Sequence, residues 1–514
     1  MATPQREPKI TSIEVQGLAR CWGINMFSSL DWTIVAIYLV GTTWIGHALR
    51  GPQATNYDFF LGGRNVPWPA VAASSIATTI SAITFVSVPA LVYAADGNFT
   101  YLQLAIGGII SRLIVAYVLV PHYFSGDYYS PYDFTRHRLG LRAGQLISGL
   151  FLVGGVLGQS VRVYATALVL ELLTGWALAE SILIITCFSI AWTWLGGIRT
   201  VIWTDVVQFF VLIGSAIFVL IYVVAALPIA GLEALTNPAT QEKLTVLNFT
   251  TDPRVAFTFW AALIALPFQN VAVYGGDQLF VQRLLCCENE KAAKKAVLLS
   301  MFGEVIPLIM LAVGLGLFVY YETFPLDPTF APMVAEKNDR ILPVFILSVL
   351  PEGVRGLIIA GLLSAAISSL DSILAALAQV SHRAAQSVWP ALKDITLSRT
   401  LVLTWGIALG VIAMTYENSS MNLVDLAFTM TTYTYGPMIG LILLSIIGLN
   451  HANWTIPAVI VSVSLVAVLN HPNWLGFTIE GAVLAWPWLF PIAAITTVGV
   501  AISLDRMTTG SREQ

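Results

Sequence analysis

The sequence predicts an all-α polytopic membrane protein, because charge is scarce and apolar residues run in long stretches. Of 514 residues, 57% are hydrophobic and 11% are charged, and the mean hydropathy is +0.78. A soluble domain carries about 25% charged residues. A chain with half that share cannot cover a water-facing surface of this size, so lipid must face much of it. The net charge of -4 gives no reason to expect a nucleic-acid partner.

Thirteen segments have about the length needed to cross a membrane. A bilayer core of about 30 Å needs roughly 20 apolar residues per helix. The predicted spans are 29–49, 67–94, 98–121, 144–172, 177–195, 199–226, 255–281, 296–320, 353–381, 399–416, 422–448, 453–470 and 482–504. Gly196, Gly197 and Arg199 alone separate the fifth span from the sixth. Residues 341–352 predict a short re-entrant or extracellular helix.

Basic residues in the short loops predict the orientation of the chain. One set of alternate loops is rich in lysine and arginine, and the opposite set is poorer; the rich set includes Arg136, Arg138, Arg142, Arg283, Lys291, Lys294, Lys295, Arg383, Lys393 and Arg399. Basic loops stay in the cytoplasm. We therefore expect an outer tail at 1–27, one transmembrane domain at 28–504 and a cytoplasmic tail at 505–514. The expected location is the plasma membrane, or the inner membrane of a bacterium.

The second span carries an unusual density of hydroxyl groups. Residues 74–84 read SSIATTISAIT, with six serines and threonines among eleven residues. Hydroxyl side chains can satisfy backbone groups where a membrane helix breaks. The alternative is that small residues pack one helix against another.

The ninth span has a small, oxygen-bearing face. Gly361, Ala365, Ser368 and Ser372 follow helical spacing, and Asp371 lies near one edge of their face. The sixth span carries a further carboxylate at Asp205. A hard cation such as sodium prefers oxygen ligands, by the reasoning that applies to calcium and magnesium. The alternatives are a helix–helix hydrogen bond or a carboxylate at the membrane edge.

The seventh span is interrupted by residues that break helices. Residues 265–278 read ALPFQNVAVYGGDQ, with a proline, two amides and a glycine pair. Secondary transporters bind substrate and ions at broken helices in corresponding positions of two inverted repeats. Helices two and seven are five apart, which predicts repeats at approximately 67–226 and 255–448.

These motifs together resemble the sodium:solute symporter family. The resemblance covers nearly the whole chain and rests on 192–200 (WTWLGGIRT), 203–208 (WTDVVQ), 277–278 (DQ), 281–283 (VQR) and 365–369 (AAISS). It implies a LeuT-type fold of five plus five helices, with one extra N-terminal and two extra C-terminal helices.

The resemblance also implies two sodium sites. The principal site would use the carbonyls of Ala77, Ile80 and Ala365 and the hydroxyls of Ser368 and Ser369. A second site, present in some members, would use Asp205, Ser368, Asp371 and Ser372. Asp371 stands where matching members carry a hydroxyl, so this carboxylate either strengthens a second sodium site or lets a proton replace the ion.

The implied substrate pocket follows no single member of the family. Residues matching the sialic acid transporters' pocket are Thr79, Ser81, Thr84, Phe99, Gln103 and Asn270. Their carboxylate-binding arginine falls near Gly158 or Gln159, one turn from Arg162. The sugar transporters' pocket lysine falls at Glu304 and their gating tyrosine at Val273, beside Tyr274. Arg162 therefore either binds an anionic substrate or pairs with Glu171 or a lipid phosphate, and a structural ion pair is expected for at least one of Arg112 and Glu304.

We expect sodium-coupled symport of a small polar solute, such as a sugar, a sugar acid or another carboxylate, by alternating access. Sodium is the expected co-transported ion. The expected partners are the small-molecule substrate and membrane lipid, with no nucleic acid and no obligate protein partner. The alternatives are a proton-coupled carrier, an amino-acid carrier or a sensor of the same fold. We do not expect an enzyme, because the spans contain no His-Glu-x-x-His or Gly-x-Ser-x-Gly motif and the four cysteines lack metal-ligand spacing.

Overall fold

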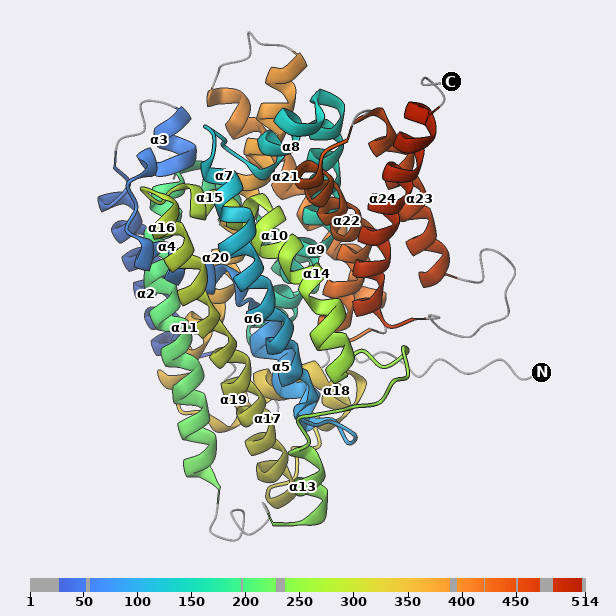
Figure 1. Cartoon of the computed structure of the whole chain (residues 1–514). Helices are drawn as coiled ribbons and strands as arrows, with labels where there is room; N and C mark the ends of the chain where they lie inside the picture. The colour runs from blue at the N-terminus through green and yellow to red at the C-terminus, as the bar shows by residue number, and fades with distance from the viewer. Residues whose placement is uncertain are drawn as a thin grey trace, which may run out of the picture.

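The computed structural model is a bundle of helices that run mostly along one direction (Figure 1). It describes residues 27–51, 56–195, 197–227, 236–388, 395–419, 421–449, 452–471 and 484–510. Every regular element within these residues is a helix. The short helix α13 lies at one end of the bundle, and α3, α8 and the C-terminal end of α24 lie at the other.

The first half of the chain provides the following helices: α2 (Ser29–Ala48), α3 (Asn56–Leu61), η1 (Gly62–Arg64), α4 (Trp68–Thr79), α5 (Ala82–Tyr93), η2 (Phe99–Gln103), α6 (Leu104–Ile114), η3 (Val115–Leu119), α7 (Val120–Phe124), α8 (Pro131–Leu139), α9 (Leu141–Thr174), α10 (Leu178–Leu195), α11 (Ile198–Ala226) and α13 (Pro238–Lys243). The predicted separation of the fifth and sixth spans is confirmed by the end of α10 and the start of α11.

The second half provides η4 (Ala261–Ala265), α14 (Leu266–Val271), η5 (Ala272–Gly276), α15 (Gln278–Leu285), α16 (Glu290–Leu299), η6 (Ser300–Glu304), α17 (Val305–Thr323), α18 (Ala331–Glu336), η7 (Asn338–Arg340), α19 (Ile341–Val349), α20 (Val354–Val388), α21 (Ile395–Thr415), η8 (Tyr416–Asn418), α22 (Leu423–Ile447), η9 (Ala452–Trp454), α23 (Thr455–Asn470) and α24 (Trp486–Gly510). The expected short helix at 341–352 is α19.

Each of the thirteen predicted spans coincides with a helix or a run of consecutive helices, but their count as membrane spans is not confirmed. Among the described residues, nine helices are long and apolar enough to cross a membrane, or ten if the bent pair α4 and α5 forms one span. The segments Leu178–Trp194 and Ala261–Gly276 are apolar but shorter.

The chain breaks between α4 and α5, within the hydroxyl-rich second span. Ile80 and Ser81 have extended backbone conformations, and the two helices meet at an angle of 56°. The amide of Ile80 still donates to the carbonyl of Ile76 at 3.0 Å. The break ends the regular ladder there, so the carbonyls of Ala77 and Thr78 become available to side chains of other helices.

The seventh span also breaks, but further along than its sequence suggests. Pro267 fits into the first turn of α14, directly after the π-helical turn η4. The amides Gln269 and Asn270 continue the helix. A second π turn, η5, closes with the amide of Asp277 donating to the carbonyl of Ala272 at 2.8 Å, and Asp277 itself is extended. The predicted interruption is therefore found at the glycine pair, directly before Asp277, and not at the proline or the amides.

The long helix α20 forms the centre of the bundle and packs against α11, α9, α21, α2 and α4. Within its most apolar 18-residue stretch, 89% of the residues are buried, against 28% in α11. Gly361 allows the close approach of α11, since a Cβ there would lie 2.1 Å from Ser215 Oγ. The helix α20 is therefore surrounded by other helices, whereas much of α11 lies on the surface of the bundle.

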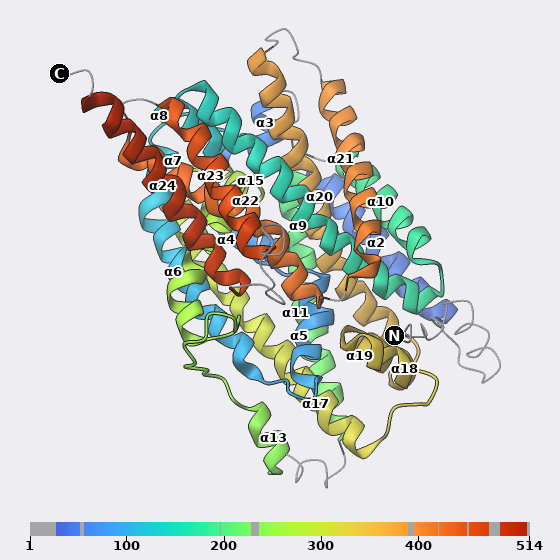
Figure 2. The ribbon, with the colours of Figure 1, turned by 90° about the vertical axis from the view of Figure 1, so that its right-hand side faces the viewer.

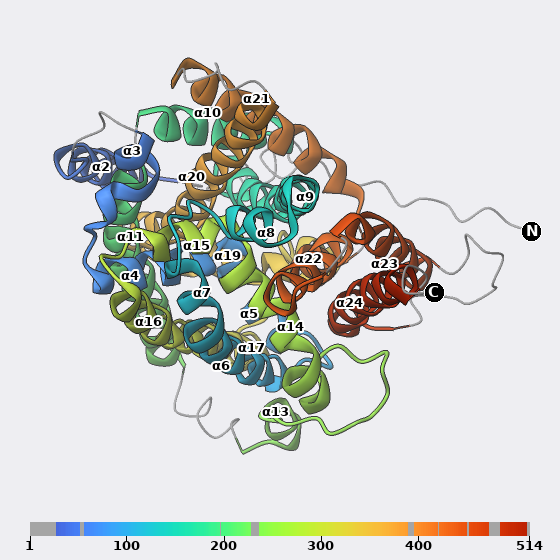
Figure 3. The ribbon, with the colours of Figure 1, turned by 45° about the horizontal axis from the view of Figure 1, so that its top comes forward.

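The first helix is tied to the start of α20. Asp31 Oδ1 accepts hydrogen bonds from the amides of Gly353 at 2.7 Å and Gly356 at 2.9 Å, and Asp31 Oδ2 lies 3.5 Å from Arg355 Nε. Figures 2 and 3 place α2 at one side of the bundle and α23 with α24 at the other. The helices predicted as additions to the five-plus-five core therefore lie at its periphery.

Candidate functional site

The break between α4 and α5 faces two serines of α20. Ser368 Oγ lies 2.9 Å from the carbonyl oxygen of Ala77 and 3.3 Å from that of Ala365. Ser369 Oγ lies 3.2 Å from the carbonyl of Thr78 and 3.1 Å from that of Ala365. Four residues predicted for the principal sodium site are thus brought together, with Thr78 as a carbonyl that sequence reasoning missed.

This oxygen cluster is buried and suits a small hard cation. Ala77, Ala365, Ser368 and Ser369 have no exposed surface, and Ile80 lies at the break itself with 3% exposed. The groups that face one another are carbonyl and hydroxyl oxygens, which are the ligands that hard cations prefer. The broken helix provides the carbonyls, and the small face of α20 provides the hydroxyls.

Arg162 of α9 reaches the same cluster from the other side. Its Nη1 donates to Ser369 Oγ at 2.9 Å and to the carbonyl of Thr78 at 3.0 Å. Within the described residues, no carboxylate lies within ion-pair distance of Arg162. The alternative of a pairing with Glu171 is therefore not what the structure shows.

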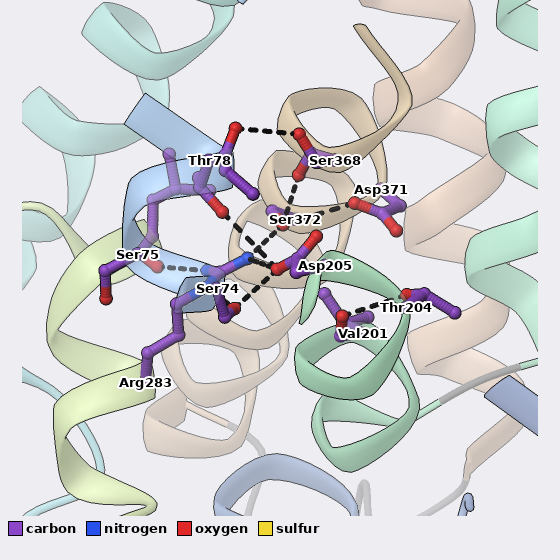
Figure 4. Close-up of polar contacts among 12 residues, drawn as sticks. Ser74, Ser75, Thr78, Val201, Thr204, Asp205, Arg283, Ser368, Asp371 and Ser372 are labelled. Atoms are coloured by element: carbon purple, nitrogen blue, oxygen red, sulfur yellow. Dashed lines mark hydrogen bonds and ion pairs between the residues drawn. The ribbon is translucent and has the colours of Figure 1, made fainter. Parts of the chain in front are cut away.

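The residues predicted for a second sodium site surround a buried arginine (Figure 4). Arg283 of α15 points between α4, α11 and α20, and its Nη2 lies 2.9 Å from Asp205 Oδ2. Arg283 Nε donates to Ser74 Oγ at 2.8 Å, and Nη2 also donates to Ser372 Oγ. Ser74 in turn donates to Asp205 Oδ2 at 2.5 Å. The guanidinium charge therefore occupies the space between Asp205 and Ser372.

Asp371 adds a second carboxylate to this cluster. It is fully buried, and its Oδ1 accepts a hydrogen bond from Ser372 Oγ at 3.2 Å. Ser372 Oγ also donates to the carbonyl of Ser368 at 2.6 Å. In the part of the chain that the structure describes, Asp371 Oδ2 and Asp205 Oδ1 are buried without a hydrogen-bond partner. Two carboxylates face one guanidinium, so a further cation or proton would balance the charge.

The structure also corrects the interpretation of Arg283 as a basic loop residue. The sequence places Arg283 among the basic loop residues that predict the orientation, yet its side chain is buried, with 1% exposed. A basic residue a few positions beyond an apolar run is typical of a loop, and only the approach of Asp205 shows that this one is buried. The signal that sequence reasoning could have used is the 281–283 motif next to a broken helix.

A cavity of about 170 Å³ lies beside the break. Seven of the nine residues predicted for the substrate pocket line it, namely Thr79, Ser81, Thr84, Asn270, Tyr274, Arg162 and Glu304. Sequence reasoning did not select other lining residues, among them Tyr101, Gln269, Phe280 and Phe428. These come from helices whose meeting is set by the fold, and no local pattern identifies them.

Phe99 and Gln103 are not among the residues that line this cavity, which corrects their prediction. Gln103 Nε2 donates to the carbonyls of Thr100 at 3.0 Å and Phe257 at 3.3 Å, and its Oε1 accepts from the amide of Asn248 at 3.0 Å. The 3₁₀ turn η2 directs this side chain toward the loop before η4. Gln103 therefore holds that loop in place.

Arg112 and Glu304 form an ion pair with each other, as a structural ion pair was expected for at least one of them. Arg112 Nη1 lies 2.6 Å from Glu304 Oε1, and Nη2 donates to Tyr274 Oη at 2.8 Å. The Arg112 guanidinium also stacks over the Tyr274 ring, 4.0 Å from its centroid. These contacts neutralise the charge of Arg112 and fix Tyr274 at the cavity wall, so Arg162 remains as the cavity's uncompensated charge.

A larger cavity of about 660 Å³ lies at the C-terminal end of α5, beside α18 and η7. Tyr101 lines both cavities. Lys337 and Asp339 line the larger one, where burial raises the pKa of Asp339 and lowers that of Lys337. Because Tyr101 borders both cavities, a small polar molecule in the larger cavity lies next to the smaller one.

A family model described as the sodium:solute symporter family matches residues 59–452. The chain is 29% identical over 459 residues to the sodium/sialic acid symporter SiaT of Proteus mirabilis (strain HI4320), covering 87% of this chain and 90% of that protein. It is 27% identical over 433 residues to the sodium/iodide cotransporter of Homo sapiens, covering 81% and 66%. It is 28% identical over 444 residues to the sodium-coupled monocarboxylate transporter 2 of Bos taurus, covering 84% and 70%.

Solved structures agree with this similarity. A Na⁺-coupled sialic acid symporter in a substrate-bound outward-open state matches with a TM-score of 0.79 and 26% identity, over 94% of this chain and 98% of that one. A nucleobase-cation-symport-1 family transporter, Mhp1, in a closed conformation matches with a TM-score of 0.55 and 15% identity, over 90% and 96%. The second match shows a shared fold alone.

Proposed function

This chain belongs to the sodium:solute symporter family and is a sodium-coupled symporter of a small organic solute, and from that premise we propose that the solute is an organic anion whose carboxylate binds Arg162. The protein is an all-helical, multi-pass membrane protein with a LeuT-like fold. Sodium is the co-transported ion.

The observation that carries this proposal is the charge inside the cavity. Arg112 is matched by Glu304 at 2.6 Å, whereas among the described residues Arg162 has no ion-pair partner and donates to a serine hydroxyl and a carbonyl. An arginine presents several N–H donors in a fork that fits a carboxylate. A carboxylate would therefore cancel a buried charge that neutral sugars leave uncompensated. The named substrates of the relatives above, sialic acid, iodide and monocarboxylates, support an anion.

We propose that sodium binds between α4 and α20, at Ala77, Ile80, Ala365, Ser368 and Ser369. The cation would join the broken helix to the central helix and hold the solute site open to the outside. Ion and solute then bind more tightly together than apart, and the effect is reciprocal by linkage. Each sodium that enters a cell held at 100 mV, negative inside, moves down this potential and contributes about 2.3 kcal/mol to accumulation of the solute.

The direction of transport rests on the proposed orientation. With the N-terminus outside and the C-terminus inside, the larger cavity at the end of α5 faces the exterior, and sodium enters the cell with the solute. The proposed location is the plasma membrane, or the inner membrane of a bacterium. The domain limits 28–504 and the repeats at 67–226 and 255–448 are proposed on the same ground.

The test is thermal unfolding of the purified protein with matched pairs of small carboxylates and their primary amides, each in sodium and in potassium. We expect a carboxylate to raise the melting temperature in sodium, with little effect from its amide or in potassium. Ser368→Ala should remove the sodium effect.

Three outcomes would contradict the proposal. Equal stabilisation by acid and amide would exclude recognition of the carboxylate. Stabilisation that is the same in potassium, with Ser368→Ala silent, would exclude the sodium site and favour a proton-coupled carrier that uses Asp371. Stabilisation by zwitterionic amino acids alone would identify an amino-acid carrier instead.

A further inference from the structure

Arg162 lies at the boundary between the proposed sodium site and the proposed solute site. We propose that its guanidinium group is a built-in cation that sodium displaces from Ser369, and that this exchange couples ion binding to solute binding. The inference rests on the proposed function, because it assumes that both sites exist. It adds how occupation of one site is transmitted to the other.

The first step is a conflict over one hydroxyl group. Ser369 Oγ accepts a hydrogen bond from Arg162 Nη1 at 2.9 Å, and its own hydrogen faces the carbonyls of Ala365 and Thr78. A hydroxyl oxygen has two lone pairs, so the arginine uses one that a cation would otherwise share. The same nitrogen also lies 3.0 Å from the Thr78 carbonyl. A positive charge so close would oppose sodium at these oxygens.

The second step is that Arg162 is held weakly where it lies. Within the described residues, its hydrogen-bond partners are a hydroxyl and a carbonyl, both neutral, and both meet the same nitrogen. Arg283, by contrast, bonds a carboxylate, two hydroxyls and a carbonyl through three different nitrogens. Charged partners hold an arginine much more strongly than neutral ones. Arg283 is therefore fixed, whereas Arg162 can be exchanged.

The third step is that the Arg162 side chain borders a cavity into which it can move. Its side chain lines the 170 Å³ cavity together with Thr79 and Asn270, so the group that contacts Ser369 also borders the solute space. A carboxylate in that cavity would attract the guanidinium away from Ser369 and free the hydroxyl for sodium. Conversely, sodium at Ser369 would repel Arg162 toward the cavity and strengthen carboxylate binding there. Each ligand thus favours the other through one side chain.

The test is a titration of sodium alone, without any solute, on the wild-type protein and on Arg162→Met. Sodium-dependent stabilisation or heat of binding gives the affinity, with potassium keeping the ionic strength constant. Removing the competing charge should tighten sodium binding by about tenfold, within the usual range of site-to-site coupling. In the same variant, sodium should no longer increase affinity for any carboxylate that binds the wild type.

Two further variants keep this test decisive. Arg162→Gln has no charge but keeps hydrogen-bond donors, and it replaces the methionine variant should that one fail to fold; it too should bind sodium more tightly. Arg142→Met removes an arginine from the same helix α9, where its Nη1 contacts Asn453 Oδ1 at 3.1 Å in an exposed position, and should leave sodium affinity unchanged.

The outcomes separate this inference from the proposed function. If the wild type binds sodium and neither Arg162 variant binds it more tightly, exchange at Ser369 is wrong and the sodium site stands. If neither the wild type nor the variants respond to sodium, the sodium site itself fails. Tighter binding in both Arg162 variants, but not in Arg142→Met, supports the exchange.

Discussion

Arg283 is buried with oxygen atoms around its guanidinium group. Asp205, Ser74 and Ser372 come from three different helices and meet there only because the chain folds. The sequence identified Asp205 and Asp371 as polar residues in unfavourable surroundings, since carboxylates in apolar spans are rare. The 281–283 motif pointed to Arg283 but not to its partner, because Asp205 lies 78 residues earlier in the chain.

We expect Asp205→Asn to destabilise the protein far more than Asp371→Asn. Breaking a buried ion pair by removing one partner costs about 3–5 kcal/mol, because the other charge stays buried and uncompensated. Asp371 receives only a serine hydrogen bond, so its loss leaves no arginine unpaired. Thermal unfolding of both variants, measured in sodium and in potassium, compares two isosteric changes in one cluster. Equal losses would show that Arg283 depends on both carboxylates.

The broken helices show which features of an element the sequence can predict. Hydroxyl groups in residues 74–84 correctly indicated a break, because they mark where freed carbonyls find partners. In the seventh span the break lies at Asp277 rather than at Pro267, because the π turns absorb the proline and shift the hydrogen-bond register. The hydrogen-bond register of a helix depends on the helices packed against it. Residue types alone therefore do not show which helix-breaking residue in the span ends the helix.

The second half of the first broken helix, α5, has a cap supplied from far along the chain. Lys243 of α13 is 3% exposed, and its Nζ lies 2.9 Å from the carbonyl of Val92 and 2.6 Å from that of Ala94. It also approaches the carbonyls of Ala95 and Gly97 at 3.4 and 3.3 Å. One ammonium group thus satisfies carbonyls that end α5.

We expect Lys243→Met to lower the stability of the protein, because methionine keeps much of the side-chain length but donates no hydrogen bonds. Carbonyls left unsatisfied and buried cost about 1–3 kcal/mol. Lys291→Met, on the exposed face of α16, is the matched control and should have no effect on thermal unfolding. A control as damaging as the test variant would show that the loss of charge, rather than the cap, is responsible.

At the scale of the whole molecule, composition predicted the class and the family resemblance predicted the arrangement. Hydropathy alone cannot separate lipid-facing helices from the core. The most apolar stretches of α20 and α11 have mean hydropathies of 2.0 and 2.7, yet 89% of the first and 28% of the second are buried.

The proposed orientation predicts which loops react with a membrane-impermeant maleimide in intact cells. In a background with Cys21 and Cys187 changed to serine, Glu242→Cys in α13 should be labelled from outside. Lys291→Cys in α16 should be labelled only after the membrane is opened. Both side chains are exposed, so burial does not separate them. The reverse pattern would place the N-terminus in the cytoplasm and invert the direction of transport.

The hydrogen bonds that Asp31 accepts from the amides of Gly353 and Gly356 can form only late in the synthesis of the chain. Asp31 leaves the ribosome 322 residues before Gly353. At rates of about 5–20 residues per second, this carboxylate waits roughly 15 to 65 s for its partners. Until then, Ser28 can hold it, since the Ser28 hydroxyl donates to Asp31 Oδ2 at 2.9 Å. A chain that stops short of α20 therefore leaves this carboxylate without its amide partners, and α2 is then held by its packing against α11.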